Sequence, residues 1–164
     1  MAFERRTARF AGTLITLLHA PAEHVKVELD ARSLATVKAG LSNIQDPLSR
    51  LMLWYTLWEM TRDAKWPVTE YADLALSSIG GEADFKIASH VLGTLHGRSH
   101  SVLSYLPQPN YPRFEEFFWS NTLKAAPEGD FQKLWFDGFV RTVSSLAGAS
   151  RLRGRLAVRA GYFL

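Results

Sequence analysis

The chain has 164 residues, of which 47% are hydrophobic and 21% charged, with a formal net charge of +3. This length and balance suit one folded domain with its own core and exclude a disordered chain. The absence of cysteine excludes a disulfide framework, thiolate catalysis and the usual zinc-finger ligands, and favours a cytoplasmic location. No apolar run approaches the roughly 18 residues of a membrane-spanning helix, so we expect no membrane partner.

Residues 1–25 give no firm element assignment. Paired arginines, an apolar stretch from Phe10 to Leu18 and the small residues of Ala20-Pro21-Ala22 form the outline of a secretory signal. Because the stretch is short and diluted by Gly12 and two threonines, a strand or a helix stub is the favoured interpretation. Strand patterns occur at 13–18 and 25–29 and are scarce elsewhere.

From residue 30 onward the sequence predicts helices separated by short breakers. Asp30 or Ser33 caps the first, which ends near Ile44, and Asp46-Pro47 marks the start of a second that runs to about residue 65. The apolar positions of this second helix cover more than half of its circumference, so we expect neighbouring helices on two sides. These positions are Leu48, Leu51, Met52, Leu53, Trp54, Tyr55, Leu57, Trp58 and Met60.

The rest of the chain continues in the same way. A third helix around 71–79 stops at Gly80-Gly81, and Asp84 caps a long fourth helix that ends at Leu106-Pro107. A fifth helix spans about 114–123, Asp130 opens a sixth, and a last basic helix covers about 149–160. The chain therefore reads as all-α, with antiparallel helix pairs, and this pattern fits either a compact bundle or a stretch of α-solenoid.

The clearest catalytic candidate is the pair His96 and His100, which four-residue spacing would place on one helix face. A zinc peptidase would have a glutamate after the first histidine, where this chain has Gly97, and no third ligand follows. We therefore expect exposed helical histidines without a metal. The adjacent acids Glu115 and Glu116 point to different sides of a helix, which favours solvation over acid–base catalysis.

A polar cluster of Glu59, Arg62 and Asp63 closes the second helix. Arg62 can pair with Glu59 one turn back, and Asp63 can cap the helix or bridge to a neighbour. Two interpretations stay open: a structural ion-pair cluster, or a cluster that faces a substrate cavity.

Basic residues gather at both ends of the chain. The stretch "RLRGRLAVR" at 151–159 has arginines at spacings of two and four, typical of an amphipathic helix, with no aromatic stacking surface between them. We therefore expect no nucleic-acid partner.

Three stretches of the sequence are more informative about a protein family than the helical periodicities are. The segments "ELDARSLATV" (28–37), "LWEMTRDA" (57–64) and "PVTEYADLAL" (67–76) resemble the C-terminal helical domain of actinobacterial aminopeptidase N, a gluzincin zinc metallopeptidase whose helical domain is shared with endoplasmic-reticulum aminopeptidases. The family usually has aspartate where this chain has Glu59. The resemblance covers about residues 25–150.

The resemblance implies a HEAT-like helical superhelix over residues 26–150, after a segment 1–25 and before a basic tail or truncated helix at 151–164. In that family the domain encloses the peptide cavity, whereas zinc and catalysis belong to a His-Glu-x-x-His helix and a Gly-x-Met-Glu-Asn loop. Neither motif occurs here, so no catalytic or metal residue is transferred, and we expect no cofactor and no activity from this chain alone.

We therefore expect a non-catalytic fragment of an aminopeptidase N, which meets peptide substrate only within a full enzyme; a split, decayed or frame-shifted gene would also explain the partial match. The alternative is a self-standing α-solenoid that binds a peptide or protein partner. The apolar ending "LAVRAGYFL" lacks a polar cap, so we expect self-association through it.

Overall fold

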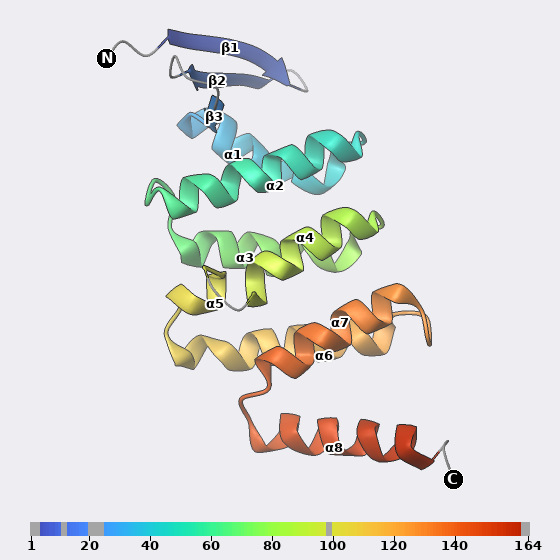
Figure 1. The fold of residues 1–164 in the computed structure, drawn as a ribbon. Coiled ribbons are helices and arrows are strands. Elements are labelled where there is room, and N and C mark those ends of the chain that lie inside the picture. Colours follow the sequence, from blue (N-terminus) through green and yellow to red (C-terminus); the bar gives the residue numbers. More distant parts are fainter. Residues whose placement is uncertain (1–3, 11–12, 20–24, 98–99, 162–164) are drawn as a thin grey trace. The chain divides into compact units, whose positions relative to one another are not determined.

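A computed structural model of the chain describes residues 4–10, 13–19, 25–97 and 100–161, with side chains from 27 to 155 within these ranges. The chain divides into two units, Met1–Val91 and Leu92–Leu164. The described residues form eight α-helices, so the predicted helical class is confirmed from residue 31 onward (Figure 1). The signal-like Ala20-Pro21-Ala22 and the side chains of the apolar ending lie outside the described residues.

A three-stranded antiparallel sheet precedes the helices, in the order β1-β2-β3. Strand β1 (Glu4–Phe10) pairs with β2 (Thr13–His19) from Glu4 opposite His19 to Phe10 opposite Thr13, and β2 pairs with β3 (Val25–Glu28). The strand patterns at 13–18 and 25–29 are thus confirmed. Strand β1 was not predicted, because "ERRTARF" has three arginines and lacks the apolar alternation of a typical strand.

The first unit continues with two helical hairpins. Helix α1 (Ala31–Gly40) leads through the 3-10 turn η1 (Leu41–Asn43) into α2 (Pro47–Arg62), and α3 (Val68–Ser78) leads through η2 (Ile79–Gly81) into α4 (Phe85–His96), which ends in the second unit. Asp30 caps α1 by accepting a 2.7 Å hydrogen bond from the Ser33 amide, as predicted.

The two hairpins share one spacing. Asp46 before α2 and Asp84 before α4 are 38 positions apart, and each accepts an amide hydrogen bond three residues later, at 2.8 Å from Ser49 and 3.2 Å from Ile87. Equivalent helices are neighbours: a 2.5 Å ion pair joins α1 to α3, and a stacked ring pair joins α2 to α4. The two hairpins therefore share a spacing and cap positions that the sequence analysis did not identify.

The tryptophans of 54–66 form an aromatic core around one tyrosine. Tyr71 on α3 is fully buried, and its ring lies 5.7, 5.3 and 6.1 Å from those of Trp54, Trp58 and Trp66. Edge and tilted contacts of this kind add to the stability that area burial provides. For these three rings the predicted role, filler between helices, is confirmed.

A second link joins the turns of the two hairpins. The guanidinium of Arg50 donates to both carboxylate oxygens of Glu82, at 3.0 and 2.8 Å, and to the carbonyls of Ile44 and Gln45. The side chains of Arg50 and Glu82 are only 13% and 9% exposed. Since Glu82 also accepts from the Asp84 amide, one ion pair fixes the chain before α2 to the chain before α4.

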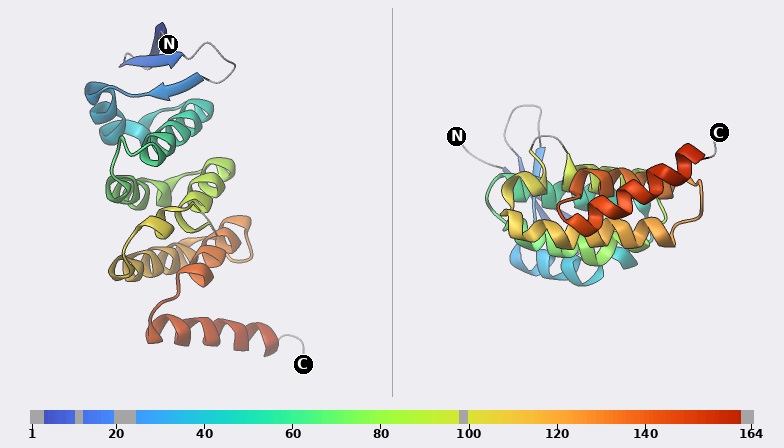
Figure 2. Two further views of the ribbon diagram at one scale, coloured as in Figure 1. Left: turned by 60° about the vertical axis from the view of Figure 1, so that its left-hand side comes forward. Right: turned by 90° about the horizontal axis from the view of Figure 1, so that it is seen from below.

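The second unit contains α5 (Val102–Tyr105), the 3-10 turn η3 (Gln108–Asn110), α6 (Tyr111–Lys124), α7 (Asp130–Thr142) and α8 (Leu146–Gly161). Helices α6 and α7 form an antiparallel hairpin (Figure 2). Their close approach depends on Gly138, where a Cβ would lie 2.3 Å from the Phe118 ring.

The predicted long helix from Asp84 to Leu106 is wrong. Helix α4 ends at His96, and His100 adopts a left-handed backbone with φ of 54°, which an α-helix cannot contain. Ser101 is extended and starts the separate helix α5. Gly93 and Gly97 weaken the helical preference of this stretch, and the apolar spacing alone did not reveal the break.

Candidate functional site

Helix α2 positions the polar cluster that the sequence singled out. Glu59 and Arg62 form an ion pair with 2.7 Å between Oε1 and Nη1, and their side chains are 38% and 49% exposed. Asp63 is the C-cap, and its amide donates to the Glu59 carbonyl. The structure thus brings Glu59 and Arg62 together at the surface, where such a pair contributes about 0.3–0.5 kcal/mol.

The residues after Arg62 end the helix in a Schellman motif. Ala64 has a left-handed φ of 56°, its amide donates to the Thr61 carbonyl at 3.1 Å, and the Lys65 amide donates to the Met60 carbonyl at 2.9 Å. Lys65 then pairs with Glu28 of β3 at 2.6 Å. The stretch "TRDA" therefore has a structural task, which is to stop α2 just before Lys65, whose ion pair links this end of the helix to β3.

An exposed apolar stripe on α2 leads up to the polar cluster. Leu48, Met52 and Tyr55 are 66%, 50% and 45% exposed, and spacings of four and three place them on one helix face. Continuing the same spacing along the helix reaches Glu59 and Arg62. The neighbours expected on two sides of α2 therefore leave these three side chains uncovered, and the three form what we call the α2 stripe.

One end of the α2 stripe rests on α4. The Tyr55 ring stacks on the His90 imidazole with a centroid distance of 3.9 Å and an interplanar angle of 36°. Burial lowers the pKa of His90. The partly buried His90 ring therefore supports Tyr55, and the tyrosine keeps 45% of its surface open.

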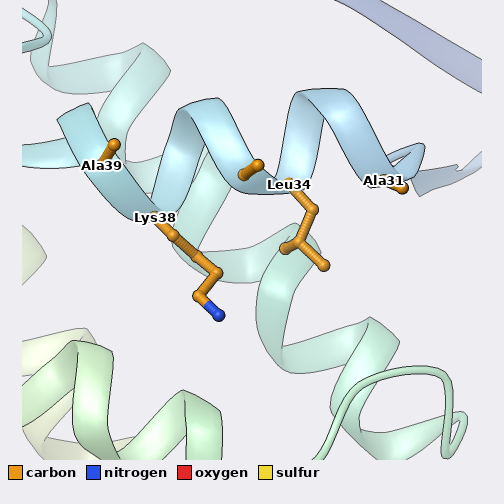
Figure 3. Close-up of a pocket in the computed structure, with 5 residues that line it drawn as sticks. Ala31, Leu34, Lys38 and Ala39 are labelled. Carbon is orange, nitrogen blue, oxygen red and sulfur yellow. The ribbon is translucent and has the colours of Figure 1, made fainter.

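A shallow hollow of 460 Å³ lies along α1 (Figure 3). Leu34, Lys38 and three alanines line it: Ala31, Ala35 and Ala39. The Lys38 ammonium is already paired with Glu70, which also accepts from the Trp66 indole at 3.1 Å, and the Lys38 bond lowers the pKa of Glu70. Small side chains and a paired charge give this hollow little to bind with.

The histidine pair does not form a site. His96 is the last residue of α4 and lies edge-on to Phe118, with ring centroids 5.3 Å apart, whereas His100 is in the following loop and contacts the Tyr105 hydroxyl at 3.2 Å. The expected shared helix face is therefore wrong, as is the expected exposure of His96. Within the described residues, no three His, Asp or Glu side chains gather as metal ligands.

A buried acid was missed by the sequence analysis. Glu115 on α6 is 4% exposed and accepts from the amides of Ser144 and Ser145, at 2.7 and 2.9 Å, and from both hydroxyls. Burial raises the pKa of Glu115, but the hydrogen bonds from Ser145 and Ser144 outweigh it and leave the pKa below its ordinary value. The prediction that Glu115 is solvated is therefore wrong, because its carboxylate instead holds the start of α8. Glu116 is exposed and pairs with Arg151 at 2.6 Å.

Comparison with known proteins gives evidence on the family of the chain, which the geometry of the polar cluster does not. No protein-family model matches the chain. Over 124 residues the chain is 32% identical to the aminopeptidase N of Streptomyces lividans, a match that covers 73% of this chain. The chain matches a segment of aminopeptidase N. It spans only 14% of that enzyme's length, so the similarity is to one part of an aminopeptidase N. Among the described helices, none is long and apolar enough to cross a bilayer.

Proposed function

We propose that this chain is a non-catalytic segment of an aminopeptidase N that forms part of the wall around the substrate cavity. The observation that carries the proposal is the 32% identity to one part of such an enzyme. The sequence contains no His-Glu-x-x-His motif, so zinc and catalysis belong to other parts of the parent enzyme.

The helical architecture supports this role. The two hairpins have equivalent caps 38 positions apart and equivalent helices side by side, which supports an α-solenoid, since HEAT-like repeats have about 40 residues. A solenoid wall presents one helix layer to whatever it encloses. The α2 stripe, with Glu59 and Arg62 at its end, is the surface of the first unit best suited to face a peptide.

A chimera tests the proposal. The matching segment of the Streptomyces enzyme is replaced by residues 25–150 of this chain, and hydrolysis of a Leu-anilide is compared with that of peptides of increasing length. We expect the chimera to keep anilide hydrolysis and the parent's dependence on peptide length, whereas deletion of the segment removes that dependence. Metal-dependent release of amino acids by the 164-residue chain alone would contradict the proposal.

The α2 stripe also favours a second candidate, a self-standing solenoid that binds a peptide or protein partner. This candidate predicts that the purified chain is a stable monomer and that the chimera is inactive although correctly folded.

A further inference from the structure

The two helix layers of the first unit differ in what they expose. Among the described residues of this unit, the large apolar side chains with substantial exposure all lie on the second helices of the hairpins: Leu48, Met52 and Tyr55 on α2, and Phe85 on α4. The first helix of the unit instead exposes Ala31, Ala35 and Lys38 along its hollow. An apolar surface confined to one layer indicates a binding face.

The size of the α2 stripe limits its occupant. From Leu48 to Tyr55 the helix rises about 10 Å, which is the length of roughly three residues of extended chain. The exposed parts of the three side chains amount to roughly 300–400 Å². A stable protein interface needs about 800 Å² from each partner, so a second copy of the chain is a poor fit and a short segment is a good one.

The spacing of the stripe also matches an extended peptide. Leu48 and Met52 are one helical turn apart, about 6 Å along the axis, and side chains on one face of an extended strand recur every 6–7 Å. Tyr55 is held by its stack on His90, so little side-chain entropy is lost when its open face is covered. Met52 is flexible and can adapt to different apolar partners.

Resting on the proposed function, we propose that the α2 stripe binds alternate bulky apolar side chains of an extended peptide, with Tyr55 as its fixed anchor. The stripe thereby favours peptides with leucine or phenylalanine at every second position over polar peptides of equal length.

Methyl NMR on the 164-residue chain tests this binding, because Met52 is 50% exposed and Met60 is 5% exposed. The chain, labelled at the methionine methyls, is titrated with an acetylated heptapeptide of alternating serine with leucine and phenylalanine, and with a serine-glycine heptapeptide. We expect a saturable shift of the Met52 methyl with the first peptide only, and a Met60 methyl that does not move.

Exposed substitutions provide the controls. Tyr55→Ser and, independently, Leu48→Ser are expected to weaken binding at least tenfold, and Leu123→Ser, at a 59% exposed position on α6, is expected to leave it unchanged. Near-ultraviolet circular dichroism checks that each variant is folded.

Three results would overturn the inference: no Met52 shift, equal shifts of Met52 and Met60, or a Met52 shift that follows chain concentration without peptide and so assigns the stripe to a second copy. If the Met52 methyl shifts but the chimera fails, peptide binding by the α2 stripe stands and the aminopeptidase role is rejected. If the chimera works but the Met52 methyl does not shift, only the proposed peptide binding by the α2 stripe is rejected.

Discussion

Among the described residues, Ala64 is one of three with a side chain and a left-handed φ, beside His100 and Glu128. A left-handed φ costs an L-residue with a Cβ roughly 1–2 kcal/mol, and glycine avoids that cost at the expense of unfolded-state entropy. We expect Ala64→Gly to stabilise the first unit by about 0.5–1 kcal/mol in urea unfolding. The control Ala35→Gly, at an exposed helical position of α1, should destabilise by about the same amount.

Replacement by alanine is expected to have opposite effects on stability at two glycines of α8. A Cβ at Gly148 would lie 2.4 Å from Oε1 of Glu115, whereas a Cβ at Gly154 meets nothing within 4 Å. Gly148→Ala should therefore cost about 1–3 kcal/mol, and Gly154→Ala should stabilise the helix by about 0.5–1 kcal/mol. Thermal unfolding followed by circular dichroism of the helices compares the stabilities of the two variants. Equal changes in stability would contradict the close approach of Glu115 to Gly148.

At the level of elements, the Arg50–Glu82 pair joins two hairpin turns. Arg50→Met leaves the Glu82 carboxylate buried without its partner, so we expect a loss of about 3 kcal/mol. Replacing both residues with methionine removes the orphaned charge and should recover more than half of that loss. A double-mutant cycle in urea measures the coupling, and additive losses would show that the pair is not coupled.

The start of α8 makes stability depend on pH through Glu115. Its folded-state pKa is lowered, so its contribution is complete above the unfolded-state pKa and is lost as pH falls through the folded one. We expect Glu115→Gln to cost about 1–3 kcal/mol at pH 7 and to flatten the fall in stability on acidification. The neighbouring exposed acid is the control: Glu116→Gln should change stability by less than about 0.5 kcal/mol.

Most of the helices could be predicted because their signals are local. Asp30, Asp46 and Pro47 mark starts that depend only on the next few residues. The break near His100 and strand β1 were missed because apolar periodicity does not record a single left-handed residue or an arginine-rich strand.

The candidate site was less predictable for a related reason. Glu59 and Arg62 lie one turn apart on one helix, so the sequence indicated their pairing. The contact that supports Tyr55 and the hydrogen bonds that bury Glu115 come from residues about 30 to 35 positions away, which no local pattern reports.

For the whole molecule, self-association through the apolar C-terminal residues stays a prediction. We expect light scattering on a size-exclusion peak to give a mass above 18.4 kDa that Tyr55→Ser leaves unchanged, since the prediction assigns self-association to the C-terminal residues and not to the α2 stripe. A monomer at every concentration would contradict this prediction and would favour the self-standing solenoid.

Short connections between paired elements have a kinetic consequence. Strands β1 and β2 are joined by residues 11–12, α1 and α2 by 41–46, α3 and α4 by 79–84, and α6 and α7 by 125–129. Because each pair closes only a small loop, little chain entropy is lost before stabilising contacts form. Domains built from such local contacts cross their folding barriers in microseconds to milliseconds, so this chain should acquire its hairpins as they leave the ribosome, before later residues exist to compete for them.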